Sequence, residues 1–159
     1  MSFIAHYYHI IFRTYKSEPS IPEESKRVLF TYIYRTVLNR GWKLIRINGY
    51  LNHIHILIAL PATVKICDVV AVLKSQSSKA FRGHRLFPEF RGWAGRYASL
   101  SVSYYEVETV KNYIIRQEAH HSSVSFRSEI DDIFKRNGLE TEDFFADNTV
   151  MNNDDRVAP

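Results

Sequence analysis

The sequence has almost no cysteine and no long apolar run. Its only cysteine, Cys67, has no second cysteine with which to form an intrachain disulfide. No stretch of 18 apolar residues could cross a membrane as a helix, and no charged leader precedes a signal-type apolar segment. We therefore expect a cytoplasmic protein without a membrane partner.

Internal repeats are also absent, and nothing in the chain suggests a second domain. Its 159 residues suffice for one core, and a hydrophobic content of 45% is typical of a globular protein. We expect one domain over residues 1–145. Residues 146–159 are polar and acidic near their end, and we expect this tail to be disordered.

Acidic residues are scarce outside the last 20 positions. Residues 140–159 contain six acidic residues and one basic residue, whereas the preceding part has 20 basic and 11 acidic residues, a net charge of +9. A basic body of this kind is typical of proteins that bind a polyanion, although many basic proteins bind none.

Alternating strand-like and helical patterns predict an α+β fold. Strands are expected at about residues 3–13, 42–47, 52–60 and 93–102, and helices at about residues 20–40, 63–81, 106–117 and 126–136. Ser20 and Glu23 have the spacing of a capping box, so the first helix should begin there. The turn between the second and third strands is either Asn48-Gly49 or Leu51-Asn52, and the pattern leaves this open.

Two histidines lie on the third predicted strand. Because successive strand side chains point to opposite faces, His53 and His55 share a face, with roughly 6.5 Å between their attachment points. Ile54, Ile56 and Ile58 occupy the opposite face, which is the natural core face. The histidine pair should therefore face a cleft or another surface, where two imidazoles can converge on one ion.

A tyrosine and a glutamine lie one turn apart on the helix expected at residues 106–117. Tyr113 and Gln117 should sit on one edge of it, with attachment points about 5–6 Å apart. His120 and His121 follow closely. We interpret these two as cationic side chains near a helix C-terminus, not as a separate metal cluster.

These residue types suit metal-assisted chemistry on a phosphodiester. Two imidazoles and an amide oxygen are three neutral ligands, and they would hold Mg²⁺ or Mn²⁺ without cancelling its charge. A tyrosine is a nucleophile whose phosphotyrosine product preserves the bond energy for religation. Its ordinary pKa is near 10, so it would need activation by the metal.

The two motifs together resemble those of a known family. His53-Ile54-His55 resembles the HUH motif, and residues 112–117 resemble the Tyr-x-x-x-Gln helix of the single-tyrosine HUH transposases, of the insertion-sequence two-hundred and six-hundred-five type. The resemblance spans about residues 5–139 and includes the order of the elements. It implies a ferredoxin-like antiparallel sheet with helices packed on one face, plus a C-terminal helix that carries the tyrosine.

The family resemblance also implies roles for individual residues. His53, His55 and Gln117 would bind the metal, and Tyr113 would attack single-stranded DNA at the ends of an insertion sequence. The products would be a 5′-phosphotyrosine and a free 3′-hydroxyl that can later rejoin DNA. Family members are homodimers in which the tyrosine helix of one subunit completes the histidine site of the other, and they bind DNA hairpins on a basic surface.

Residues 74–96 are the basic segment considered for that surface. Our candidates for DNA binding are Lys74, Lys79, Arg82 and Arg85. The same segment contains Phe81, Phe87, Phe90 and Trp93, which could stack on bases or could belong to the core.

The chain departs from the family pattern at two places, and two other functions are alternatives to the transposase. The family often has an acidic residue where this chain has Asn52, and a hinge glycine where it has residues 101–104. A non-catalytic single-strand nucleic-acid-binding module is one alternative, and a related nicking enzyme is another. Tyr104 and Tyr105 are rival nucleophiles, but neither has a glutamine one turn on.

Overall fold

The computed structural model describes residues 2–146. The expected tail therefore lies outside the described residues from position 147 onward. The strands are β1 (Tyr7–Thr14), β2 (Lys43–Tyr50), β3 (His53–Ala59) and β4 (Trp93–Val102). The α-helices are α1 (Lys26–Asn39), α2 (Ile66–Phe81), α3 (Val107–Ile115), α4 (Gln117–His121) and α5 (Phe126–Arg136). Short 3-10 helices are η1 (Tyr15–Ser17), η2 (Tyr104–Glu106) and η3 (Glu142–Phe145).

The four strands form one antiparallel sheet in the order β2-β3-β1-β4. Helix α1 connects β1 to β2, and α2 connects β3 to β4, so each helix crosses over one intervening strand. This arrangement confirms the predicted α+β fold with a ferredoxin-like antiparallel sheet.

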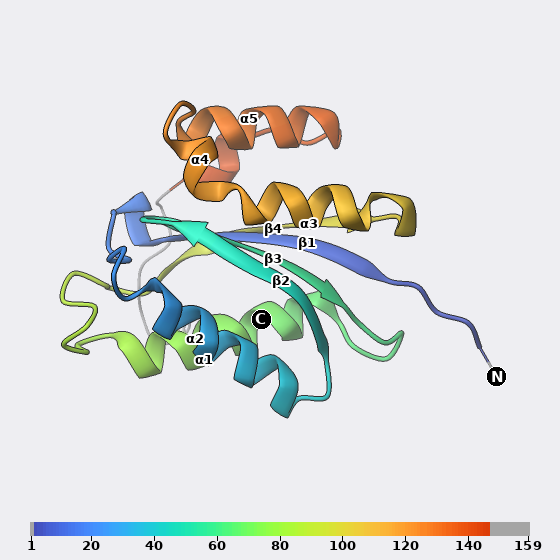
Figure 1. The fold of residues 1–159 in the computed structure, drawn as a ribbon, viewed down its shortest axis with the longest axis horizontal. Coiled ribbons are helices and arrows are strands. Elements are labelled where there is room, and N and C mark those ends of the chain that lie inside the picture. Colours follow the sequence, from blue (N-terminus) through green and yellow to red (C-terminus); the bar gives the residue numbers. More distant parts are fainter. Residues whose placement is uncertain (1, 147–159) are drawn as a thin grey trace.

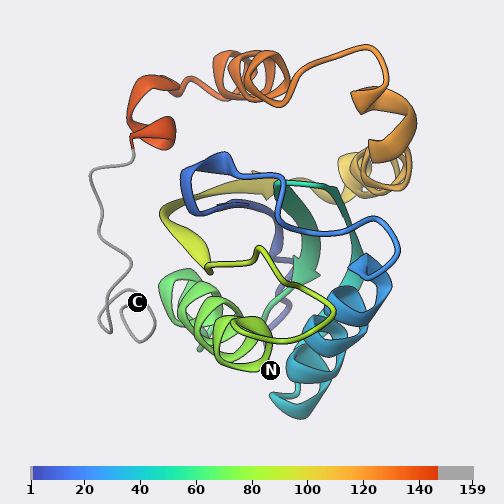
Figure 2. The ribbon, with the colours of Figure 1, turned by 90° about the vertical axis from the view of Figure 1, so that its left-hand side faces the viewer.

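Helices cover both faces of the sheet. Figure 1 shows α1 and α2 on one side of it and α3, α4 and α5 on the other, and Figure 2 shows the same layers from the end. Ile54, Ile56 and Ile58 pack into the main core with α1 and α2. Because side chains alternate along β3, His53 and His55 face the layer of α3, α4 and α5, as the sequence predicted.

The aromatic rings between α2 and β4 belong to the core. Phe87, Phe90 and Trp93 are buried in the cluster under α1 and α2, together with Phe81 at the end of α2. The indole nitrogen of Trp93 donates to the hydroxyl of Ser77, at 2.8 Å. These rings are therefore packed inside the protein and are not available to stack on bases.

Tertiary hydrogen bonds correct one predicted boundary and decide the turn that the sequence left open. Helix α1 begins at Lys26, not at the capping box of Ser20, because the Ile21 amide donates to the Leu51 carbonyl at 2.9 Å and holds this segment outside the helix. The β2–β3 turn is Leu51-Asn52, since Tyr50 pairs with His53. Within residues 2–146, no helix is both long and apolar enough to span a bilayer.

Candidate active site

The histidine pair lies on β3, in the interior of the sheet between β2 and β1. Both side chains are completely buried. Their Nδ1 atoms are held by polar neighbours: His53 Nδ1 lies 2.8 Å from Asn52 Oδ1, and His55 Nδ1 lies 2.8 Å from His9 Nε2. The Nε2 atoms of both histidines are therefore the ones that face the space under α4 and α5. Asn52 orients His53 although it is not the acidic residue common in the family pattern.

His9 is a member of this site that the sequence analysis did not include. It lies on β1, opposite Leu57 in the antiparallel register, so it shares a sheet face with His55. Its buried ring lies 5.0 Å from the ring of His55 between centroids. Such orienting partners fix the tautomer of a metal-binding histidine.

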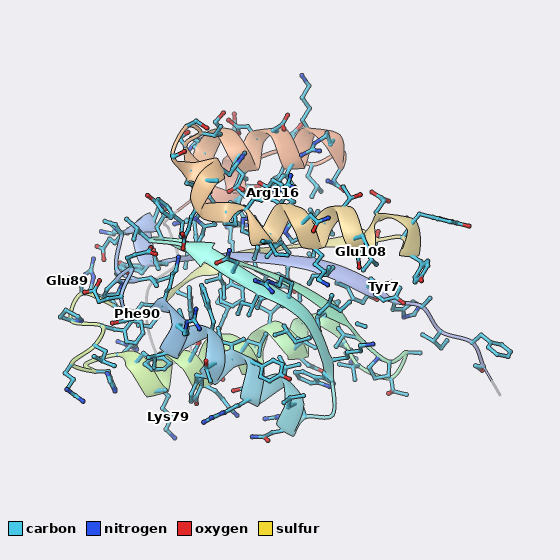
Figure 3. All side chains as sticks on the ribbon, in the orientation of Figure 1. Tyr7, Lys79, Glu89, Phe90, Glu108 and Arg116 are labelled. Atoms are coloured by element: carbon cyan, nitrogen blue, oxygen red, sulfur yellow. The ribbon has the colours of Figure 1, made fainter. Side chains whose placement is uncertain are left out.

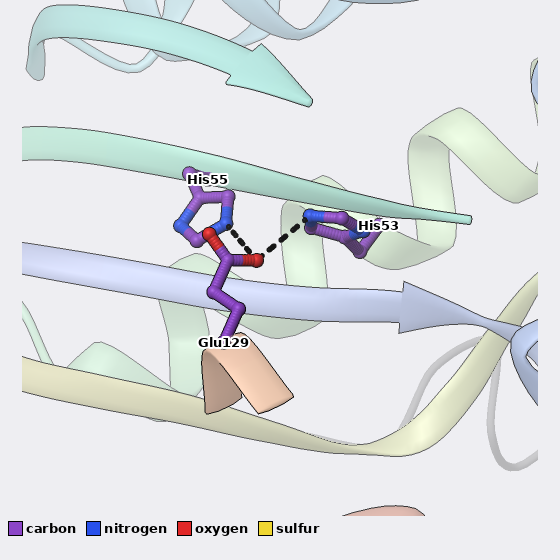
Figure 4. Close-up of side chains that lie close together, drawn as sticks. All are labelled: His53, His55 and Glu129. Atoms are coloured by element: carbon purple, nitrogen blue, oxygen red, sulfur yellow. Dashed lines mark ion pairs between the residues drawn. The ribbon is translucent and has the colours of Figure 1, made fainter. Parts of the chain in front are cut away.

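A buried carboxylate faces both histidines. Glu129 of α5 places Oε1 3.3 Å from His53 Nε2 and 3.5 Å from His55 Nε2 (Figure 4). The candidate ligand atoms of these three residues all lie within 4.8 Å of one another. Two imidazole nitrogens and a carboxylate oxygen at these separations can hold a divalent metal ion.

Glu129 was also missed by the sequence analysis. It shares the buried stripe of α5 with Phe126, Ile130 and Ile133. A charged residue within an apolar stripe needs a partner, because a buried and unpaired carboxylate is costly. The position of this charged residue in an apolar stripe was the sequence signal from which Glu129 could have been identified.

Gln117 reaches the same place because the predicted helix of residues 106–117 breaks. Helix α3 ends at Ile115 and α4 begins at Gln117. The Asn48 side-chain amide of β2 donates to the carbonyl oxygens of Ile114 and Ile115, at 2.9 and 3.1 Å, and so satisfies the α3 end. Gln117 Oε1 lies 3.0 Å from His53 Nε2, and its Nε2 donates to Glu129 Oε2 at 2.7 Å.

Tyr113 lies on α3 beside this cluster, within the same chain. Its hydroxyl donates to Glu129 Oε2, and its ring centroid lies 5.8 Å from that of His55. Burial, together with the charge of Glu129, raises the pKa of the half-buried phenol well above its ordinary value. The structure thus brings together Tyr113, Gln117 and both histidines of the same chain.

His121 joins the cluster from the end of α4. Its Nε2 lies 2.9 Å from Glu129 Oε1, and its Nδ1 lies 2.9 Å from the Val124 carbonyl oxygen. His120 Nε2 lies 3.7 Å from Glu129 Oε2. The two histidines do end a helix, but the interpretation as helix-end cations alone was incomplete, because both also face the buried carboxylate.

Burial and hydrogen bonding set the charges of the cluster. Burial lowers the pKa of His53 to about 4, although the nearby carboxylate of Glu129 opposes this shift. Burial and the nearby His55 hold the pKa of His9 well below its ordinary value. For Glu129, burial favours a higher pKa, but the imidazoles of His121, His53 and His55 that face its carboxylate outweigh burial and keep this pKa well below the ordinary value. The site at neutral pH therefore contains a carboxylate and a neutral His53.

The donor set fits a cation. When His53 Nδ1 donates to Asn52, its Nε2 lone pair faces Gln117 Oε1 and the nearer Glu129 oxygen, which are both acceptors. The buried His55 Nε2 has no hydrogen-bond partner within residues 2–146. A divalent ion would satisfy these lone pairs together.

The candidate DNA-binding residues lie elsewhere. Lys79, Arg82 and Arg85 are exposed at the end of α2 and in the loop after it, and Lys74 is largely buried on α2. Figure 3 shows Lys79 on the outer side of α2, across the sheet from Tyr113's helix. The structure does not bring these four residues to the tyrosine site.

Comparison with known proteins finds two similar structures and one matching family model. A candidate transposase from Deinococcus radiodurans R1 has a similar structure, with a TM-score of 0.57, 23% identity and coverage of 73% of this chain and 93% of that one. The REP-associated tyrosine transposase bound to a REP hairpin has a TM-score of 0.60 and 14% identity over 88% of this chain and 86% of that one. No curated protein matches the sequence. The family model described as transposase IS200-like matches residues 2–117, which is most of the chain, and the protein therefore belongs to the IS200-like transposase family.

Proposed function

We propose that this transposase cleaves and rejoins single-stranded DNA at insertion-sequence ends through a 5′-phosphotyrosine on Tyr113. The observation that carries this proposal is the meeting of Tyr113, Gln117 and the histidine pair within one chain. Gln117 Oε1 lies 3.0 Å from His53 Nε2, and the Tyr113 ring lies 5.8 Å from that of His55.

The residues supply a nucleophile and a place for its proton. The Tyr113 oxygen forms a bond to phosphorus while the bond from phosphorus to the 3′ oxygen breaks, and that oxygen leaves as a 3′-hydroxyl. The phenol proton passes by way of Glu129, to which the hydroxyl already donates, to the leaving 3′ oxygen, so the step neither gains nor loses a proton. In the reverse direction a 3′-hydroxyl attacks the phosphotyrosine, and DNA is rejoined without external energy.

His53, His55, Gln117 and Glu129 are the residues that would hold the metal, for which we propose Mg²⁺ or Mn²⁺. A bound divalent ion supplies positive charge that polarises the scissile phosphate and offsets the charge that develops in the transition state. Asn52 and His9 keep the two imidazoles turned so that their Nε2 atoms face the ligand space.

The proposal also includes a DNA-binding surface outside the catalytic site and the oligomeric state of the protein. The similarity to a REP-associated transposase bound to a hairpin supports hairpin binding here, with Lys79, Arg82 and Arg85 as the exposed candidate residues and Lys74 beside them. We also propose a homodimer, as the family resemblance implies. Because Tyr113 docks in its own subunit, each subunit would carry a complete site.

The test is a covalent adduct on a denaturing gel. Protein and Mn²⁺ are incubated with labelled single-stranded oligonucleotides taken from the flanks of its own gene. We expect an adduct with the wild type, none with Tyr113→Phe, and strong suppression by chelation or by His55→Ala. Binding that survives all three treatments without any adduct would instead identify a non-catalytic single-strand-binding module.

A further inference from the structure

Two pockets open on either side of Tyr113. The first has a volume of about 260 Å³ and lies between α3, β4 and the end of α5, where Ser101, Arg136 and Asn137 border it. The second, of about 610 Å³, lies between α3 and α4 and is bordered by Asn112, Arg116 and His120. Tyr113 and Thr109 line both pockets, so the tyrosine stands between them.

Access to the nucleophile is limited to this side of the molecule. The side chains of His53, His55 and Gln117 are completely buried, whereas Tyr113 is only half-buried. A phosphate that reaches the Tyr113 hydroxyl must therefore come from the side of the molecule on which these two pockets open. The nucleotides on its two sides would then occupy one pocket each.

One arginine borders each pocket. Arg116 and Arg136 are both exposed, and Arg136 lies near enough to Tyr113 to oppose the upward shift of its pKa. Arg136 contacts Asp132 only loosely, at 3.5 Å, through an exposed pair that binds it weakly. The other charge beside the first pocket is Glu106, which accepts a hydrogen bond from Ser103. Two guanidinium groups that flank a nucleophile are suited to the phosphates before and after the cleaved one.

The second pocket contains a further unsatisfied group. His120 Nε2 is buried and has no hydrogen-bond partner within the described residues, and the His120 ring lies 5.4 Å from that of Tyr113 between centroids. The charged group nearest to this nitrogen is the Glu129 carboxylate, whose Oε2 lies 3.7 Å away. Figure 3 places Arg116 on this side, between α3 and α5, whereas Lys79 lies beyond the opposite face of the sheet.

We propose that the two pockets together form a single-strand DNA channel in which Arg116 and Arg136 bind the phosphates flanking the one at Tyr113. This inference rests on the proposed function and adds binding residues to it. The channel would bring the DNA strand to Tyr113. The basic residues of α2 do not explain this access, because they lie on the opposite side of the sheet.

Binding of an unstructured strand tests the channel without any cleavage. A fluorescein-labelled oligonucleotide of twelve deoxythymidines is titrated with Tyr113→Phe protein in chelator, at several salt concentrations, and fluorescence anisotropy is measured. Adding Arg116→Ala and Arg136→Ala should weaken binding about tenfold or more at moderate salt and lower the slope of log affinity against log salt by about 1.4, since each single-strand phosphate contact contributes about 0.7. Replacing both arginines with lysine should largely keep the slope.

Arg35→Ala is the matched control, because Arg35 is an exposed arginine of α1 on the opposite side of the sheet. It should leave affinity and slope unchanged. The channel is contradicted if the double alanine variant binds with the wild-type slope, or if the slope falls only when Lys79 and Arg82 are replaced. Because this assay forms no adduct, its outcome is independent of whether Tyr113 is the nucleophile.

Discussion

At the scale of single residues, Glu129 connects the parts of the site. Its two oxygens contact the Tyr113 hydroxyl, the Gln117 amide and the imidazoles of His53, His55 and His121. A carboxylate adds a negative ligand to a set that otherwise contains only neutral groups. It should therefore raise the affinity for a divalent cation.

Replacing Glu129 with glutamine tests this role. The variant keeps the size of the side chain and removes its charge, so Mn²⁺ affinity at neutral pH should fall by about tenfold or more. Isothermal titration calorimetry of the metal-free protein measures this directly. Asp131→Asn is the matched control, since Asp131 is an exposed acid on the same helix, and it should bind Mn²⁺ like the wild type. Equal Mn²⁺ affinities of the wild type, Glu129→Gln and Asp131→Asn would show that Glu129 does not bind the metal.

Sequence reasoning reached only part of this residue set. His53, His55, Tyr113 and Gln117 were found because each pair has a short, periodic spacing that places its members on one face. His9 on β1 contacts His55, and Glu129 on α5 lies close to both His53 and His55. Both residues are distant from the histidine pair in the sequence. A local sequence pattern carries no information about such long-range contacts, although the charge of Glu129 within an apolar stripe was a usable signal for this residue.

At the scale of elements, prediction succeeded where the local pattern agrees with the tertiary environment. Strand β4 and helix α5 have the predicted bounds, and α2 lies within the predicted range. It failed at the start of α1 and at the break between α3 and α4, where hydrogen bonds with the β2–β3 hairpin decide the backbone. Asn48 and Leu51 of that hairpin make those bonds.

Gly49 shows why the Asn-Gly pair is not the turn. It lies within β2, and a Cβ added there would come within 2.3 Å of the His53 backbone oxygen. Gly49→Ala should therefore force the strands apart and lower the free energy of unfolding by about 2–3 kcal/mol. Thermal and urea denaturation measure the loss.

Gly83→Ala is a suitable comparison for that variant. Nothing lies within 4 Å of a Cβ at Gly83, so only its positive φ of 74° opposes alanine, at a cost of about 1 kcal/mol. The close approach at Gly49 would be disproved if the Gly49 variant were no less stable than the Gly83 variant.

At the scale of the whole molecule, one chain brings together Tyr113, Gln117, Glu129 and the two histidines of β3. The family model ends at residue 117, but α5, which carries Glu129, follows it. Tyr113 reaches the histidines of its own subunit across the sheet face that α3, α4 and α5 cover. This arrangement differs from the exchange of tyrosine helices that the family resemblance implied.

Mixing two inactive variants distinguishes these arrangements. Tyr113→Phe lacks the nucleophile and His55→Ala lacks a metal ligand, so a site built within one chain cannot be restored by combining them. We expect the mixture to form no adduct, while wild type mixed with either variant keeps its activity. Adduct formation by the mixed variants would show that the site is shared between two subunits.

The most direct measurement maps the covalent adduct by mass spectrometry. Trypsin should release residues 112–116, with Tyr113, separately from residues 97–111, which contain Tyr104 and Tyr105. After reaction with single-stranded DNA and nuclease trimming, we predict a phosphate-linked nucleotide on Tyr113 in the shorter peptide. A nucleotide on the longer peptide, or no modified peptide under conditions in which the DNA is cleaved, would contradict the account.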